Sequence, residues 1–246
     1  KLQQLGTPTV QQLLDNVKAN YGKITDLKAD YTVKIQSAEF VNWLNNLGRN
    51  ITGDLFIQKN EYYFKPPDKI KIVPPYEPKT IITKNNIEYR RMGTGMLFVV
   101  TKDTPVGASS QPWYTLLNPD RFDFYWRLDE IITKFDSRVI SHPTTDVWVI
   151  EAVPKAGNPE DEYNYPAPGW LRYEFTTDFN KGVFTKIIAI GIEDDSVSSI
   201  RELSNFELIN NTWIPTKLVK TVEETEEYTL SNIQLNTSIP DSEFEF

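Results

Sequence analysis

The chain contains one histidine, His142, and no cysteine. A Ser/His/Asp triad would have to use His142, which precedes Pro143 in a polar stretch typical of a solvated turn. The absence of cysteine excludes disulfides, thiolate nucleophiles and thiolate metal ligands. A single histidine also excludes the histidine clusters that bind zinc or copper. Carboxylates are therefore the main remaining candidates for chemistry.

Acidic residues occur in pairs at Asp194-Asp195, Glu223-Glu224 and Glu226-Glu227. Paired carboxylates can chelate calcium or act as general acid and base. Each pair lies beside a predicted turn, however, and the position favours a charged hairpin tip. The short run Gly93-Thr94-Gly95 lacks the third glycine and the following helix of a phosphate-binding loop. From these residues we expect no catalytic site, no metal and no cofactor.

Composition narrows the class of protein further. The 246 residues carry a formal net charge of −8, which would repel a nucleic-acid backbone, so nucleic acid is not an expected partner. No apolar run approaches the roughly 18–20 residues that span a membrane. No Gly/Ser linker divides the chain, so we expect one domain over residues 1–246. Aromatic residues make up 13% of the chain, which suits a ligand cavity or a large barrel interior.

The most readable stretch begins with a helix pattern and continues as a strand. Thr9–Gly22 has apolar residues at helical spacing, with Thr9 at the N-cap position and Gly22 expected as the left-handed residue that ends the helix. The strand that follows, 27–35, alternates strictly between apolar and polar residues, so one face should be buried. The helix is expected to pack on that buried face.

Most of the remaining chain predicts strands about ten residues apart, which is typical of an antiparallel sheet or barrel. Slips in the alternation near Lys186 and Glu202 indicate bulges. Residues 40–47 are too irregular to assign and are interpreted as a loop, and 154–168 is expected to be a surface loop. An aromatic helical insertion is expected between 102 and 135. The predicted strands are 50–58, 61–65, 68–73, 80–83, 87–92, 96–101, 137–141, 146–153, 170–176, 183–192, 199–208, 212–222 and 227–235.

A sheet that closes only partly, with helices over its open face, would form a concave apolar surface suited to an acyl chain. Periodicity equally allows the aromatics simply to fill a core. If the surface binds a ligand, its wall is expected at Tyr31, Val33, Leu55, Ile57, Tyr63, Ile70 and Ile81. The lid over that wall is expected at Trp113, Leu117, Phe122 and Trp126.

Three stretches resemble the LolA family of periplasmic lipoprotein carriers. The first is Val10-Gln11-Gln12-Leu13-Leu14-Asp15-Asn16-Val17 with Leu27-Lys28-Ala29-Asp30-Tyr31. The second runs from Gly53-Asp54-Leu55 to Phe64-Lys65-Pro66-Pro67-Asp68-Lys69-Ile70-Lys71-Ile72. The third is Leu230-Ser231-Asn232-Ile233-Gln234-Leu235-Asn236 with Ile239-Pro240-Asp241-Ser242-Glu243-Phe244-Glu245-Phe246. Together they are similar to the first helix and strand, the glycine-led strand with its basic proline turn, and the closing strand of the family.

The resemblance implies a mainly β fold, an incomplete antiparallel barrel with a lid formed by the N-terminal helix and the central insertion. It also implies an exported monomer of the periplasm or cell envelope, without enzymatic activity, that carries lipoprotein acyl chains or lipid between membrane-bound donor and receptor proteins. One position departs from the pattern, since Pro66 stands where characterised carriers have an arginine before the proline of the basic turn. Envelope-stress sensing or protein interaction on the same fold is the alternative function.

Overall fold

The computed structural model describes residues 7–46, 48–66, 69–73, 79–84, 87–92, 96–100, 128–133, 135–155, 171–221 and 224–245. Between residues 79 and 100 the description covers the backbone of three strands, without their side chains. All statements below refer to these residues.

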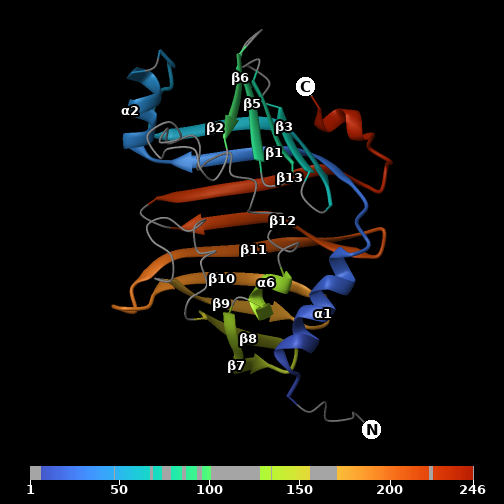
Figure 1. Cartoon of the computed structure of the whole chain (residues 1–246). Helices are drawn as coiled ribbons and strands as arrows, with labels where there is room; N and C mark the ends of the chain where they lie inside the picture. Colours follow the sequence, from blue (N-terminus) through green and yellow to red (C-terminus); the bar gives the residue numbers. More distant parts are fainter. Residues whose placement is uncertain are drawn as a thin grey trace.

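The thirteen strands of the described residues form a single antiparallel sheet in the order β6-β5-β4-β3-β2-β1-β13-β12-β11-β10-β9-β8-β7 (Figure 1). The order is linear, so among the described strands β6 and β7 are the two edges and the sheet is not closed. This confirms the predicted mainly β, incomplete-barrel fold. The strands are β1 (Leu27–Gln36), β2 (Leu55–Lys65), β3 (Lys69–Val73), β4 (Lys79–Lys84), β5 (Ile87–Met92), β6 (Met96–Val100), β7 (Phe135–Thr144), β8 (Val147–Pro154), β9 (Leu171–Asp178), β10 (Val183–Gly191), β11 (Val197–Ile209), β12 (Thr212–Thr221) and β13 (Thr225–Leu235).

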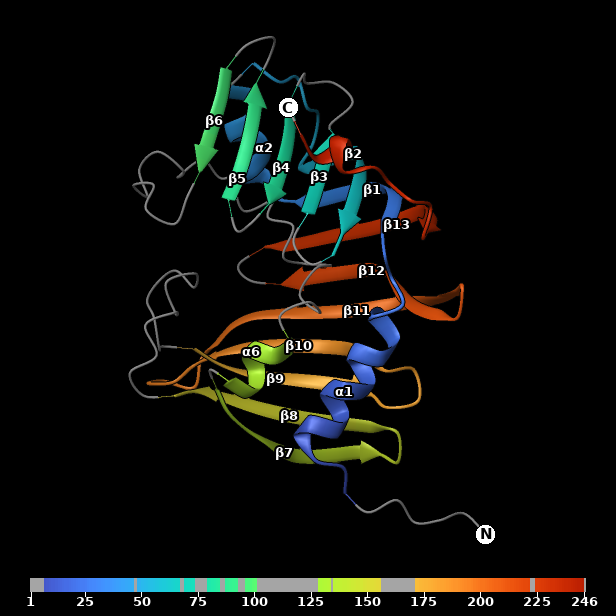
Figure 2. The same cartoon turned by 45° about the vertical axis from the view of Figure 1, so that its right-hand side comes forward.

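In the described part of the chain, three α-helices pack on one face of the sheet. Helix α1 (Val10–Tyr21) contacts β10 and β12, and α6 (Leu128–Thr133) contacts α1 and β7. Figures 1 and 2 both show α1 and α6 over the same part of the sheet. Helix α2 (Ala38–Asn46) packs on β2, where the Phe40 ring meets the Phe56 ring edge-on at 5.4 Å between centroids. We call this covered side the inner face.

The central strand β1 shows how the sequence determines the two faces. Its odd-numbered residues from Leu27 to Ile35 are buried, whereas its even-numbered residues are exposed or half-buried. The buried side joins one continuous apolar cluster that reaches from α1 and α6 across the sheet to Ile70 and Ile72 of β3. Because residues directly opposite each other in an antiparallel pair share a face, β1 fixes the facing of β2 and β13.

The two ends of the N-terminal helix lie where the sequence predicts them. The Thr9 hydroxyl accepts a hydrogen bond from the Gln12 backbone N–H, and the Gln12 side chain accepts one from the Thr9 N–H. This reciprocal capping box satisfies two backbone donors of the first turn. The helix stops at Gly22, whose N–H bonds to the Lys18 carbonyl, but Gly22 has φ −63° and is right-handed, so the predicted left-handed conformation was wrong. The predicted helix is confirmed.

The structure corrects three of the predicted elements. Residues 40–47, interpreted as a loop, are mostly helix α2, in which Phe40, Val41 and Leu44 are buried. Its asparagines are poor helix formers, so the pattern was hidden by weak propensity rather than by wrong spacing. The predicted strands 50–58 and 61–65 are one strand, β2, because the polar residues between them are part of the ladder with β1.

The predicted irregularity at Lys186 is a register shift between Phe184 and Lys186 against β9. The second shift lies at Ala189/Ile190 against β11, whereas Glu202 pairs in register with Lys186. Alternation thus located the first bulge and misplaced the second by a few residues.

Candidate functional site

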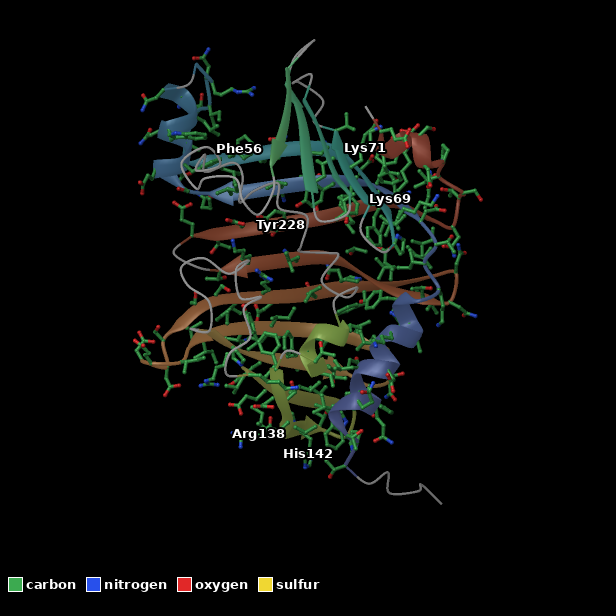
Figure 3. The ribbon with its side chains drawn as sticks, viewed as in Figure 1. Phe56, Lys69, Lys71, Arg138, His142 and Tyr228 are labelled. Atoms are coloured by element: carbon green, nitrogen blue, oxygen red, sulfur yellow. The ribbon has the colours of Figure 1, made fainter. Side chains whose placement is uncertain are left out.

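Three tyrosines form a row across the inner face where β2, β1 and β13 meet. The Tyr31 and Tyr228 rings stack with centroids 5.9 Å apart, and Tyr31 meets Tyr62 at 5.7 Å. All three side chains are buried. The Tyr228 hydroxyl donates a hydrogen bond to Glu226, so the row combines apolar ring surface with a polar edge. Figure 3 shows Tyr228 near the middle of the sheet. We call Tyr62, Tyr31 and Tyr228 the tyrosine row.

Four of the predicted wall positions lie in the tyrosine row or on the same side of the sheet. Tyr31, Val33 and Ile70 are all buried on the inner face, as expected. Ile81 of β4 stands opposite Ile72, and its backbone position is all that is described. The register therefore brings these four predicted wall positions to one side of the sheet; their binding of a ligand stays a prediction.

Three other predicted wall residues were assigned to the wrong face. Leu55 stands opposite Gln36 and Ile57 opposite Lys34, on the outer face, where they are 40% and 51% exposed. Tyr63 also faces outward, opposite Lys28. An apolar side chain was assumed to point inward, but Phe56 and two polar residues of β2 take the neighbouring inner positions instead.

Those inner polar residues are Gln58 and Asn60, which sequence reasoning missed. Gln58 is opposite Val33 and Asn60 is opposite Tyr31. Buried Asn60 donates to the Tyr31 carbonyl oxygen at 3.3 Å and accepts a hydrogen bond from the Gln58 amide at 2.7 Å. A buried amide satisfied in this way costs little, which is why it can replace an apolar residue. Because successive strand residues alternate between the two faces, counting by twos from Tyr62 and Phe64 would have placed Gln58 and Asn60 on the inner face.

Charged residues also reach the inner face, at the end of β12 and the start of β13. Lys220 is opposite Glu226, and Arg201 of β11 is opposite Lys220. The Lys220 Nζ lies 3.6 Å from Glu226 Oε1, and both side chains are 15% exposed. Sequence reasoning missed them because it treated the Glu226-Glu227 pair as a hairpin tip. Counting every second residue back from Tyr228 would have placed Glu226 inward.

The outer face of β1–β3 is covered by the C-terminal segment. Tyr63 packs against Ile239 and Phe244, and two lysine ammonium groups lie over its ring, Lys28 at 5.0 Å and Lys71 at 5.3 Å from the centroid. Burial, followed by the hydrogen bond to Glu61, raises the pKa of Tyr63. Tyr63 is therefore part of a structural contact on the outer face and not of the inner wall.

Ion pairs hold the short helix η3 (Asp241–Phe244) on this outer face. Asp241 bonds to Lys65 at 2.6 Å and to Lys69 at 2.9 Å, and these two lysines lower its pKa to about 2. Lys71 pairs with Glu243 at 2.8 Å and lowers the pKa of that carboxyl. Figure 3 shows Lys69 and Lys71 beside η3. Lys65, next to the divergent Pro66, thus serves this outer contact.

The predicted lid residues Trp113, Leu117, Phe122 and Trp126 lie outside the described residues. Only the end of the predicted insertion is described, as α6. There Leu128 and Ile131 are buried in the main core, and Ser137 of β7 donates to the Ile131 carbonyl. This end of the insertion packs on the inner face, as expected of a cover.

Of the other candidates, His142, Asp194 and Asp195 are exposed, Glu224 and Glu227 are half-buried, and Glu223 and Gly93-Thr94-Gly95 lie outside the described residues. His142 is in strand β7 rather than in a turn, with its ring 5.1 Å from the Trp148 ring (Figure 3). Asp194 and Asp195 lie in the β10–β11 turn, and Asp195 bonds to Arg172 at 3.0 Å. No group of three or more His, Asp or Glu side chains suitable for a metal occurs among the described residues. None of the described helices is long and apolar enough to cross a membrane.

Comparison with solved structures identifies the architecture. A putative outer membrane lipoprotein-sorting protein domain from Vibrio parahaemolyticus superposes with a TM-score of 0.63 and 10% identity, covering 96% of this chain and 97% of that one. A LolA superfamily protein from Nitrosomonas europaea gives 0.61 and 9%, covering 98% and 99%. The chain has a LolA-like fold.

A DUF1329 family protein from Desulfovibrio piger also superposes on this chain, with a TM-score of 0.62 and 13% identity, covering 97% of this chain and 98% of that one. No protein-family profile matches the sequence, and no curated protein matches it significantly. These likenesses cover whole chains, including the inner face, at identities that establish the fold alone.

Proposed function

We propose that the protein is a carrier or chaperone that binds the acyl chains of lipoproteins or lipids on the inner face of its sheet. The observation that carries the proposal is the inner face itself, where the tyrosine row and its aliphatic neighbours form one continuous apolar surface beneath α1, α2 and α6. Because these side chains are already buried, the gain comes from the acyl chain, whose own apolar area leaves water at roughly 25 cal/mol per Å².

The LolA-like fold supports the same proposal, because two solved relatives are described as a LolA superfamily protein and a lipoprotein-sorting domain. On this proposal the protein works in the periplasm or cell envelope, exchanges cargo with membrane-bound donor and receptor proteins, and catalyses no reaction. Pro66 in place of the carrier arginine makes this chain a divergent member of such a group.

The test measures binding of a neutral fluorescent acyl probe, such as a pyrene-labelled fatty alcohol, to the parent protein and two variants. Gln58→Glu places a carboxylate on the inner face, where Gln58 stands opposite buried Val33. Ile57→Glu adds the same charge one residue away on the outer face. A charge beside a bound acyl chain must be desolvated, so Gln58→Glu is expected to weaken binding about tenfold.

The Ile57→Glu variant is the matched control and is expected to bind like the parent. Circular dichroism and melting temperature verify that both variants fold. A parent protein that binds no acyl probe contradicts the proposal and favours the protein-interaction alternative. Equal weakening by both variants would place the probe somewhere other than on the inner face.

A further inference from the structure

The outer face of β1–β3 carries a cluster of lysines around one aromatic ring. Tyr63 of β2 stands between Lys28 of β1 and Lys71 of β3, whose ammonium groups lie 5.0 and 5.3 Å from the ring centre. In the next row on the same face, Lys65 is opposite Lys69. Because directly opposite residues share a face, these five side chains all project outward. We call them the basic face.

The sheet supplies fewer carboxylates than lysines around the basic face. The adjoining row holds Asp30 opposite Glu61. Asp30 accepts a hydrogen bond from Asn232, and Glu61 accepts one from the Tyr63 hydroxyl. With these two carboxylates counted, the described side chains of the three rows keep a net charge of +2, in a chain whose net charge is −8. Clustered like charges repel one another, so the basic face favours an acidic partner.

The chain's own η3 occupies the basic face and shows what chemistry it binds. Asp241 pairs with two of the lysines at 2.6 and 2.9 Å, and Glu243 pairs with a third at 2.8 Å. Next to these ion pairs, Phe244 and Ile239 are buried in one apolar cluster against Tyr63. The bound pattern is therefore an apolar residue, two carboxylates two residues apart and then a phenylalanine.

Side chains attach η3 to the basic face, and this kind of attachment is exchangeable. The backbone N–H groups of Glu243 and Glu245 bond to carbonyls within the segment rather than to a strand. The Asp241 and Glu243 side chains are 60% and 42% exposed, and exposed ion pairs are individually weak and screened by salt. The Asp26 carboxylate separately holds residues 237–239. Another segment with the same pattern can therefore displace η3 while the preceding residues stay in place.

We propose that the basic face is a docking site for an acidic, phenylalanine-containing peptide segment of a partner protein, and that η3 occupies the site until the partner displaces it. The inference goes beyond the proposed function and does not depend on lipid binding. A peptide reproduces both the carboxylates of η3 and the buried Phe244 ring. An anionic membrane surface would pair with the lysines but offers no ring to pack against Tyr63, so the contacts favour a peptide.

The experiment measures, by fluorescence anisotropy, binding of a labelled peptide that copies residues 239–244. In the protein, Asp241→Asn combined with Glu243→Gln weakens the internal contact and keeps the shape of η3. This double variant should bind the peptide about tenfold more tightly than the parent, because its internal competitor is weaker. A peptide with amides in place of both carboxylates, and one with alanine in place of phenylalanine, should each bind the double variant about tenfold more weakly.

Two matched controls separate the basic face from general charge effects. Glu202→Gln combined with Glu207→Gln makes the same change in net charge at exposed positions of β11, and should bind the peptide like the parent. Added to the double variant, Lys69→Gln should weaken peptide binding about tenfold, because Lys69 pairs with Asp241. Added in the same way, Lys186→Gln, which removes an exposed ion-pairing lysine of β10, should leave peptide binding unchanged. Circular dichroism verifies that each variant folds.

Each outcome supports or overturns the docking site. Tighter peptide binding by the double variant, lost again with Lys69→Gln, supports it. A double variant that binds the peptide no more tightly than the parent shows that η3 makes a structural contact alone, and overturns it. Peptide binding that survives Lys69→Gln lies elsewhere and also overturns it. Binding of the double variant to phosphatidylglycerol vesicles, without binding of the peptide, overturns it in favour of a membrane surface. Acyl-probe binding is measured separately, so the proposed function stands or fails independently.

Discussion

Asp26 holds the C-terminal segment against the sheet through a single carboxylate. One oxygen accepts hydrogen bonds from the Thr237 N–H at 2.7 Å and the Thr237 hydroxyl at 2.9 Å. The other accepts from the N–H groups of Ser238 at 2.9 Å and Ile239 at 3.4 Å. Burial alone would raise the pKa of Asp26, but these hydrogen bonds outweigh it and the pKa is lowered.

Asp26→Asn is expected to destabilise the protein by about 2–3 kcal/mol. An amide has one oxygen, so its NH₂ group would face backbone N–H donors that the carboxylate now satisfies. Urea unfolding measures the change in the free energy of unfolding. Asp30→Asn is the control, because Asp30 is exposed and bonds to Asn232, and its effect should stay within about 0.5 kcal/mol. Equal effects of the two substitutions would show that the Asp26 hydrogen bonds add no special stability.

Single residues of β2 show where sequence reasoning reaches its limit. The strict alternation of β1 correctly predicted the facing of Tyr31 and Val33. In β2 both faces carry apolar and polar residues, so polarity gave the wrong facing for Leu55 and Ile57. Counting by twos from Tyr62 and Phe64 would have given the facing of Asn60. The hydrogen bond that satisfies its buried amide goes to the Tyr31 carbonyl, 29 residues away in the chain, and no local pattern contains such a contact.

At the scale of elements, η3 is attached to the outer face by carboxylates whose pKa values are lowered. Lys65 and Lys69 lower the pKa of Asp241 from 3.8 to about 2. A carboxylate with a lowered pKa in the folded state stabilises the fold above its unfolded pKa, and the contribution disappears as the pH falls through the folded value. The attachment of η3 should therefore weaken between about pH 4 and pH 2.

Acid release of η3 can be measured with one fluorophore, because the chain contains no cysteine of its own. A label on Ser242→Cys, at an exposed position of η3, should lose anisotropy between pH 4 and pH 2. A label on Asn211→Cys, in the exposed β11–β12 turn, should keep its anisotropy until global unfolding. Simultaneous loss at both labels would mean that acid unfolds the whole chain rather than freeing this element.

Elements with strong local signals were predicted well, and those stabilised by tertiary contacts were not. Helix α1 has a capping box and a terminal glycine in its sequence, and its boundaries were predicted nearly to the residue. Helix α2 depends instead on packing of Phe40 against Phe56 and Trp43. Its stability comes from burial of an amphipathic face, which its asparagine-rich composition conceals.

At the scale of the whole molecule, the single sheet has two parts with different orientations. Figure 1 shows β1, β2 and β13 running across the view while β5 and β6 stand nearly upright. The upright part joins the rest through β2, whose C-terminal half pairs with β3. The apolar cluster nevertheless continues across this junction, from Leu218 of β12 through Tyr31 to Ile72 of β3. Because one apolar core spans both parts of the sheet, the expectation that residues 1–246 form one domain makes a testable prediction about unfolding.

We expect one cooperative unfolding transition that responds equally to substitutions in either part. Ile72 and Leu218 are both buried, and truncating either to alanine should cost about 3 kcal/mol. At roughly 2–4 °C per kcal/mol for a domain of this size, each variant should lower one common melting temperature by about 6–12 °C. Scanning calorimetry with near-UV circular dichroism measures this, with equal calorimetric and van't Hoff enthalpies as the criterion for one unit. If Ile72→Ala instead produces an early partial transition that Leu218→Ala does not, β3–β6 unfold as a separate unit, because the common core then fails to couple them.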